Sequence, residues 1–151
     1  MPRVQRRVDV AWEGNLARGS GELSAQTGAF HGLPFSLASR VAQAEGKTSP
    51  EELLAAAHAG CWTMSLAGEL TGAGTPPERL TVAATTTLDE VEGAGHRIVA
   101  SDIHARARVP GIDRAEFERA VEAADAGCPF SALIRASATV SVDAELEEAG
   151  V

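Results

Sequence analysis

Alternating hydrophobic and polar residues predict several β-strands along the chain. In the segment 6–12, Val8, Val10 and Trp12 alternate with polar neighbours, which is the pattern of a strand with one buried face. The other segments that we interpret as strands are 21–25, 28–41, 79–91, 96–109 and 136–146. Glycines and a proline interrupt the segment 28–41, and the turn-like sequence EGAG joins the two longest strands.

A long helix is predicted to begin at Pro50 and to end near Gly72. Ser49 is suited to cap it, and Glu52 completes a Ser-x-x-Glu capping box. Small or apolar residues then recur at steps of three and four, which predicts one face packed against the core. These residues are Leu54, Ala57, Cys61, Met64 and Gly68. A stretch rich in glycine and proline ends the pattern.

A second helix is predicted over the segment 113–128. Its apolar face also follows the helical period and carries Phe117, Val121, Ala124 and Cys128. Pro129 is expected to bend the chain directly after this helix. Each of the two cysteines of the chain therefore lies on the apolar face of its own helix.

Strands come before, between and after the two helices, without a regular alternation of strand and helix. This order favours an α+β fold with a mostly antiparallel sheet and two main helices packed on it. No internal repeat or linker interrupts the 151 residues, so we predict a single domain spanning 1–151. The formal net charge of −8 argues against nucleic acid or an anionic membrane surface as a partner. The only basic cluster is the N-terminal group Arg3, Arg6 and Arg7.

The N-terminal sequence has no apolar stretch of signal-peptide length, and the apolar segment 53–70 carries His58 and Glu69. We therefore expect a cytoplasmic protein without a membrane span. In a reducing compartment, two cysteines are poor candidates for a permanent structural disulfide. Two buried thiols that only fill space, a structural bridge and a reactive pair all stay open from the pattern alone.

A reactive cysteine needs a cation close to it, because burial alone raises the pKa of a thiol and the thiolate is the nucleophile. Arg40, at the end of the sequence FSLASR, is the best-placed candidate. A zinc site made by both cysteines with His31 or His58 is the rival chemistry. No Cys-x-x-Cys or His-x-x-x-His spacing supports it, and we expect His58 to be a hydrogen-bonded, half-buried ring.

Five segments of the chain resemble the OsmC/Ohr family, the osmotically inducible and organic hydroperoxide resistance proteins. They are AWEGNLARGSGEL, PFSLASR, TSPEELLAAAHAGCWTMSL, VPGID and AGCPFSALIRASATV. They occur in family order and cover nearly the whole chain. The sequence AHAGC, together with an arginine in FSLASR, resembles the OsmC branch more than the Ohr branch.

The resemblance implies an OsmC-like fold and a cysteine-based, peroxiredoxin-like antioxidant enzyme that reduces organic hydroperoxides with a thiol reductant. It implies no metal, haem or flavin cofactor. Cys61 matches the peroxidatic cysteine and Cys128 the resolving one. Arg40 and Glu51 match the residues that bind and orient at the reacting thiol. Arg18 lies near the position of the arginine of the Ohr branch and is the second choice, more simply a turn residue.

Glu51 and Cys61 are ten residues apart on the predicted helix, which corresponds to about 15 Å along its axis. An unbroken helix would therefore keep Glu51 away from Cys61 of the same chain. The resemblance implies an intertwined homodimer, in which Glu51 would serve the site of another subunit. The alternative functions are a non-catalytic redox sensor or binding protein on the same scaffold, and a domain held by a structural disulfide.

Overall fold

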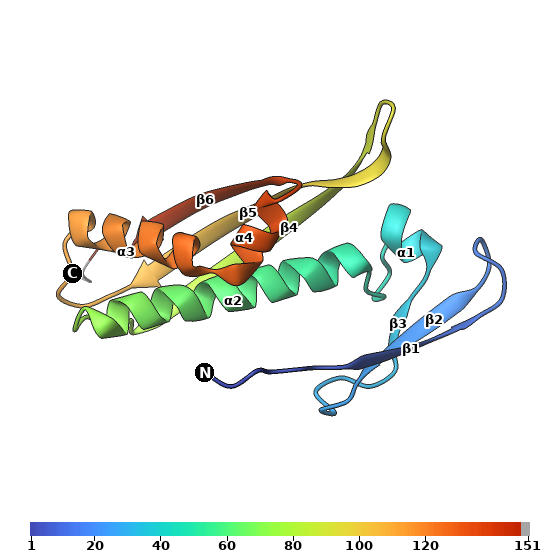
Figure 1. Cartoon of the computed structure of the whole chain (residues 1–151), viewed down its shortest axis with the longest axis horizontal. Coiled ribbons are helices and arrows are strands. Elements are labelled where there is room, and N and C mark those ends of the chain that lie inside the picture. Colours follow the sequence, from blue (N-terminus) through green and yellow to red (C-terminus); the bar gives the residue numbers. More distant parts are fainter. Residues whose placement is uncertain (149–151) are drawn as a thin grey trace. The chain divides into compact units, whose positions relative to one another are not determined.

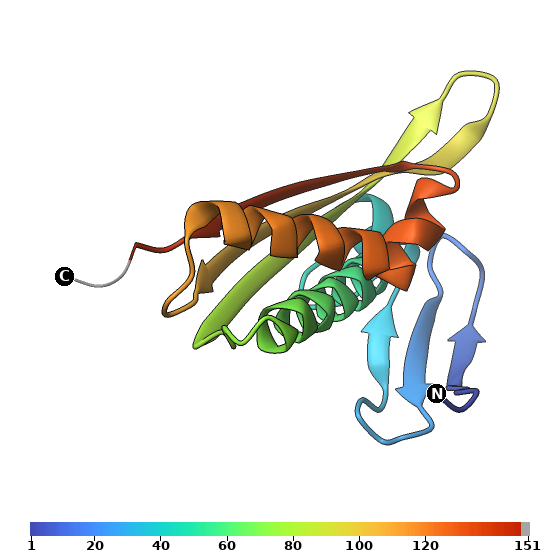
Figure 2. The ribbon, with the colours of Figure 1, turned by 60° about the vertical axis from the view of Figure 1, so that its left-hand side comes forward.

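A computed structural model of the chain describes residues 1–148, and the last three residues of the predicted 1–151 domain lie outside this range. Contacts divide the chain into two compact units, and the boundary in the sequence lies between Leu53 and Leu54, inside one long helix. Figures 1 and 2 show the elements of each unit. The prediction of a single domain stays a prediction.

The first unit contains a small antiparallel sheet and a short helix. The strands β1 (Val8–Glu13), β2 (Ser20–Ala25) and β3 (Leu33–Phe35) pair in chain order. The expectation of strands through to residue 41 is wrong, because β3 is followed by the helix α1 (Leu37–Val41). Ser36 caps α1 through its hydroxyl, and Ser39 bonds back to the Ser36 N–H.

The second unit contains a longer sheet with the order β4-β5-β6. The strands β4 (Arg79–Val91) and β5 (Gly95–Arg108) form the predicted hairpin, with a register shift between Thr87 and Leu88. The last strand, β6 (Thr139–Leu146), pairs with β5 in parallel. A parallel neighbour needs a crossover connection, and here the crossover contains two helices. They are α3 (Arg114–Gly127) and α4 (Pro129–Arg135), separated by the bend that was predicted at Pro129.

The helix α2 (Pro50–Gly72) has the predicted bounds, and the Ser49 hydroxyl accepts the backbone N–H of Glu52. The buried face predicted for α2 is wrong on the C-terminal side of Cys61. Met64 is 76% exposed and Gly68 is also exposed. The side chains that α2 buries completely are His58, Trp62, Leu66 and Leu70. The core-facing stripe is therefore rotated relative to the predicted one.

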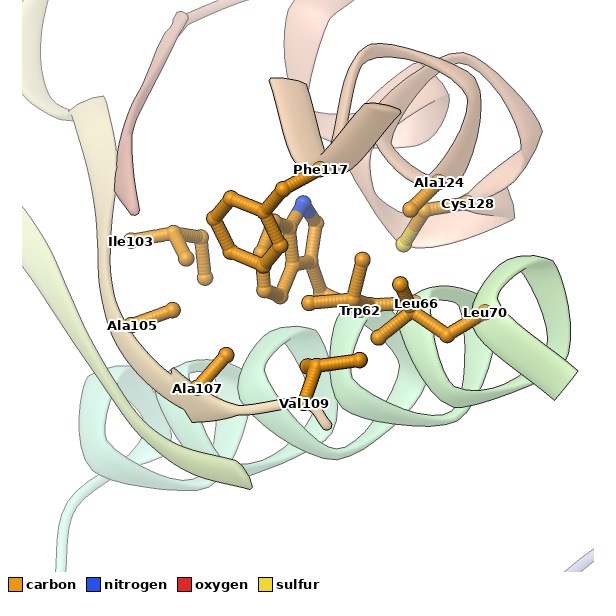
Figure 3. Packing of buried hydrophobic residues seen from close by; sticks show 10 residues of the cluster. All are labelled: Trp62, Leu66, Leu70, Ile103, Ala105, Ala107, Val109, Phe117, Ala124 and Cys128. Atoms are coloured by element: carbon orange, nitrogen blue, oxygen red, sulfur yellow. The ribbon is translucent and has the colours of Figure 1, made fainter. Parts of the chain in front are cut away.

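The core of the second unit lies between β5 and the helices α2 and α3, as Figure 3 shows. Phe117 and Ala124 of α3 are buried as predicted, and so is Cys128. The inward residues of β5 alternate with exposed ones, and the small side chains of Ala105 and Ala107 let the helices approach the sheet. The α+β class is thus confirmed, with two three-stranded sheets and four helices in the described part of the chain.

Candidate functional site

The two cysteines lie next to each other in the second unit. Cys61, on α2, is partly exposed, whereas Cys128 is fully buried. Cys61 packs against the hydrophobic cluster that contains Cys128, and the two thiols are close enough to hydrogen bond. Both are free thiols in this structure, and the Cys128 side chain points toward α2 (Figure 3). The Cys61 sulfur is therefore accessible to a small molecule, whereas the Cys128 sulfur is buried next to it.

The surroundings of Cys61 within this unit favour its protonated form. Burial raises the pKa of the Cys61 thiol, and the hydrogen bond with the Cys128 thiol raises it further. The backbone N–H of Phe130 acts in the opposite direction by hydrogen bonding to the sulfur. Because the thiolate is the nucleophile, a reactive Cys61 needs a positive charge in addition to these groups.

Arg40 and Glu51, the two charged residues singled out from the sequence, contact each other in the first unit. Arg40 lies in α1, and its Nε and Nη2 are 2.9 Å and 2.7 Å from the same Glu51 oxygen, Oε1. The Glu51 side chain is only 11% exposed, while that of Arg40 is 43% exposed. The second carboxylate oxygen, Oε2, is buried without a hydrogen-bond partner in the described chain. The Glu51 carboxylate therefore holds the Arg40 guanidinium in place, and part of the Arg40 side chain stays exposed.

The helix that carries both Glu51 and Cys61 is continuous. Because α2 has no break between these residues, they are separated by about 15 Å along its axis. Arg18, the alternative arginine, lies in the exposed turn before β2, and its backbone N–H bonds to the Asn15 side chain. Of the two arginines, only Arg40 is paired with Glu51.

Cys128 occupies the corner between α3 and α4 and takes part in capping both helices. Its N–H donates to the carbonyl of Asp125 at 3.3 Å, and its Sγ accepts the N–H of Ser131 at 3.5 Å. Pro129 follows at the first position of α4, where a missing N–H is harmless. The sequence Cys-Pro-x-Ser therefore fixes the backbone around the buried thiol.

The hydrogen bonding expected for His58 is confirmed, whereas its expected half-burial is wrong. His58 is completely buried rather than half-buried, and both ring nitrogens are hydrogen-bonded. Nδ1 lies 2.6 Å from the Ser101 hydroxyl of β5, and Nε2 lies 2.9 Å from the Ser131 hydroxyl. Burial lowers the pKa of His58, Asp125 raises it and Arg135 lowers it again, with burial as the largest cause. The ring is therefore neutral at pH 7.

The hydrogen bonds around His58 fix its tautomer. Ser131 Oγ donates to Asp125 Oδ1 at 2.8 Å, so this oxygen accepts the proton of His58 Nε2. Nδ1 is then the acceptor for the Ser101 hydroxyl. Asp125 is also paired with Arg135. A signal for this network was present in the sequence only as a histidine one helical turn before Cys61.

The apolar side chains that α2, α3 and α4 contribute near the cysteines differ in burial. Phe130 is partly buried against the cluster that holds both cysteines, whereas Phe117 is a core residue and Met64 is exposed. A surface cavity of about 390 Å³ lies between the end of α2 and α3, and neither cysteine lines it. Within residues 1–148, no cluster of three or more His, Cys, Asp or Glu side chains is arranged to hold a metal ion. The same residues form no helix that is long and apolar enough to cross a membrane.

Comparison with known proteins identifies the family of this chain. The model of the family described as OsmC-like protein matches residues 43–143. The chain is 35% identical over 137 residues to the protein named Peroxiredoxin OsmC from Escherichia coli K12, covering 91% of this chain and 94% of the relative.

Solved structures share the fold at lower sequence identity. An OsmC-like protein of unknown function from Vibrio cholerae matches with a TM-score of 0.78 at 13% identity, covering 94% of this chain and 99% of its own. An organic hydroperoxide resistance protein from Elizabethkingia anophelis matches with a TM-score of 0.71 at 21% identity, covering 97% of this chain and 100% of its own. From the family model and the E. coli relative together, this chain belongs to the OsmC-like protein family.

Proposed function

We propose that this protein is a cysteine-based peroxidase that reduces organic hydroperoxides, with Cys61 as the peroxidatic and Cys128 as the resolving cysteine. The observation that carries the proposal is the adjacency of a partly exposed thiol and a buried thiol in a member of this family. The relative named Peroxiredoxin OsmC supports the same reaction class. The packing of Cys61 against apolar residues supports an alkyl hydroperoxide as the substrate.

In the first step, the Cys61 thiolate attacks one peroxide oxygen of ROOH. The O–O bond breaks, Cys61 becomes a sulfenic acid, and the alkoxide leaves and takes up a proton to give the alcohol ROH. A guanidinium stabilises both the thiolate and the departing alkoxide, because it stays charged and offers several donors in a fixed geometry.

In the second step, the Cys128 sulfur attacks the sulfur of the Cys61 sulfenic acid. The S–O bond breaks, a Cys61–Cys128 disulfide forms and water leaves. A dithiol reductant then attacks this disulfide, becomes oxidised itself and returns both cysteines to thiols. Each turnover thus transfers two electrons from the dithiol to the peroxide.

The guanidinium in this proposal is that of Arg40 from a second copy of the chain, held by its own Glu51. Three observations support this choice. Cys61 needs a cation, and the groups of residues 54–148 that shift its pKa, which are the Cys128 thiol and the Phe130 N–H besides burial, include none. Continuous α2 also keeps Glu51 about 15 Å along the axis from Cys61. The Arg40–Glu51 pair is already assembled, with part of the guanidinium exposed. In a symmetric homodimer, each active site would then use cysteines from one subunit and the charged pair from the other.

Exposed apolar side chains on β1 support a homodimer. Val8, Val10 and Trp12 are 47%, 57% and 38% exposed, although they occupy the alternating positions that normally face a core. Surfaces of this kind mark sites where another protein surface packs. A second copy is the occupant that also explains the charge requirement of Cys61.

A steady-state assay with tert-butyl hydroperoxide and dithiothreitol tests the function. We expect continuous turnover by the wild type, none by Cys61→Ser, and a single turnover followed by overoxidation of Cys61 in Cys128→Ser. A redox sensor would instead react once and stop in the wild type as well. A structural disulfide would make Cys128→Ser unfold rather than overoxidise.

Co-expression of two inactive variants tests the subunit arrangement. Mixed dimers of Cys61→Ser and Arg40→Met contain one site with both an intact Cys61 and an intact Arg40 if these residues come from different subunits. Random mixing should then recover about a quarter of the wild-type activity. If Arg40 acts on Cys61 of its own chain, every site lacks one of the two groups and mixing recovers nothing.

A further inference from the structure

We propose that His58 is a positioning residue for Cys128, and that it acts through Ser131 to hold the corner between α3 and α4 within reach of Cys61. This inference rests on the proposed function and adds to it a residue that takes no part in the bond-making steps. Its basis is a buried hydrogen-bond network that connects the helix of one cysteine to the loop of the other.

Ser131 is the centre of this network. Its backbone N–H donates to Cys128 Sγ at 3.5 Å, its Oγ accepts from His58 at 2.9 Å, and the same hydroxyl donates to Asp125 at 2.8 Å. Ser131 is completely buried. A shift of this residue therefore moves the group that holds the Cys128 sulfur.

Asp125 closes the corner on its other side. Its carbonyl accepts the N–H of Cys128 at 3.3 Å, and its carboxylate accepts from Ser131 and pairs with Arg135. Asp125, Cys128 and Ser131 are thus tied into one small loop of hydrogen bonds. His58 connects this loop to α2, one helical turn before Cys61.

The His58 ring is itself held rigidly. Ser101 of β5 donates to Nδ1 at 2.6 Å, so the ring is fixed from the sheet on one side and holds the corner on the other. The ring has no exposed surface. Buried networks in which every member is satisfied make a core rigid, because each broken hydrogen bond leaves an uncompensated polar group.

Rigid positioning matters because two reactions compete for the Cys61 sulfenic acid. Attack by the Cys128 sulfur gives the disulfide and water, whereas a second hydroperoxide molecule gives the sulfinic acid and a second alcohol. The first reaction is intramolecular, and its rate depends on how often the two sulfurs are correctly aligned. A loosened corner should therefore slow resolution and favour overoxidation, without changing the first attack on peroxide.

The chain offers a matched control. Ser65 of α2 also bonds to α3, from its Oγ to the carbonyl of Ala124 at 2.7 Å. This hydrogen bond joins α2 to α3, whereas that of His58 joins α2 to Ser131 of α4, and it does not contact the hydrogen bonds around Cys128. Ser65→Ala therefore removes a comparable link between helices and leaves the corner intact, whereas His58→Leu removes the link to the corner.

Two measurements test the inference on wild type, His58→Leu and Ser65→Ala. A titration of the cysteine pair in glutathione redox buffers gives the effective concentration of Cys128 at Cys61 without any peroxide. Mass spectrometry after one equivalent and after an excess of tert-butyl hydroperoxide gives the ratio of disulfide to sulfinic acid. We expect His58→Leu to lower the effective concentration by about 10- to 100-fold and to raise the sulfinic fraction, and Ser65→Ala to change neither beyond about twofold.

Equal effects of His58→Leu and Ser65→Ala, or no effect of His58→Leu, would overturn the inference. His58→Gln, which keeps a donor and an acceptor, should recover part of the loss. If His58→Leu does not fold, Ser131→Ala breaks the same link from the other side and is judged by the same two measurements. A wild type without peroxide turnover would refute the proposed function, while the glutathione titration would still decide the role of His58.

Discussion

The asymmetry of the Arg40–Glu51 pair predicts that its two members respond very differently to replacement. Glu51 is nearly buried, with one oxygen bonded twice to Arg40 and the other without a partner, whereas Arg40 is 43% exposed. In Arg40→Met, a buried carboxylate loses the charged partner that it has in the described residues 1–148. In Glu51→Met, the charge and the unpartnered oxygen disappear together, and water can solvate the released guanidinium.

The magnitudes follow from the exposures. Removing one partner of a fully buried pair costs about 3–5 kcal/mol, and exposed pairs are worth about 0.2–1 kcal/mol. Because solvent reaches Arg40, we expect Arg40→Met to lie between these limits, at about 2 kcal/mol. Glu51→Met should stay within about 1 kcal/mol of wild type, and the double variant should be more stable than Arg40→Met alone, since replacing both charges leaves no buried ion.

Urea unfolding of the four proteins at one protomer concentration measures these differences. The equal concentration matters because dimerisation would stabilise the folded state by mass action. An Arg40→Met protein as stable as wild type, or a double variant less stable than both single ones, would refute the reasoning. The first result would mean that the Glu51 carboxylate is well solvated, and the second that the pair stabilises the fold beyond the cost of desolvating it.

Three further predictions concern the fold. Leu66→Ala should cost about 2–5 kcal/mol in urea unfolding, whereas Met64→Ala should stay within about 0.5 kcal/mol, and equal losses would contradict the buried face described for α2. Gly21→Ala should destabilise β2 by about 1–3 kcal/mol, since its Cβ would lie 2.4 Å from the Phe35 ring; unchanged stability would show that the ring can move. The third concerns His58, whose pKa is lowered in the folded state, so that the unfolded chain binds the extra proton. Wild-type stability should therefore fall as the pH drops through about 6.5, and a pH slope identical in His58→Leu would contradict this.

Elements with strong local signals could be predicted from the sequence. The hairpin of β4 and β5 follows two long alternating runs, and the start of α2 follows from the capping side chain of Ser49. The bend between α3 and α4 follows from Pro129. In each case, the residues that decide the structure are close together in the sequence.

The rest depends on choices that are not local. Alanine and glycine occupy many positions of α2, so its hydrophobic pattern does not distinguish one face clearly. The face that is buried in the structure carries the larger side chains Trp62, Leu66 and Leu70. The parallel pairing of β6 with β5 depends on the path of the crossover, and α1 is too short to show helical periodicity. The buried face of α2, the parallel pairing of β6 and the helix α1 therefore cannot be predicted from the properties of individual residues.

Some residues of the candidate site could also be predicted from the sequence, and others could not. Both cysteines lie on helical faces that the sequence marks as apolar, which permits their adjacency without showing it. The family resemblance singled out Arg40 and Glu51, and these two residues contact each other in the first unit. The partners of His58 are 43 and 73 residues away from it in the sequence. Serines at such distances carry no sequence pattern, so the network becomes visible only in three dimensions.

The two tryptophans of the chain provide an optical reporter in each unit. Trp12 in β1 is 38% exposed, and Trp62 in α2 is completely buried, so their emission spectra should be centred at different wavelengths. Trp12→Phe leaves only the signal of the second unit, and Trp62→Phe leaves only that of the first. Denaturation midpoints that coincide in the two variants would mean that both halves melt as one cooperative body, and separate midpoints would mean that each half melts alone.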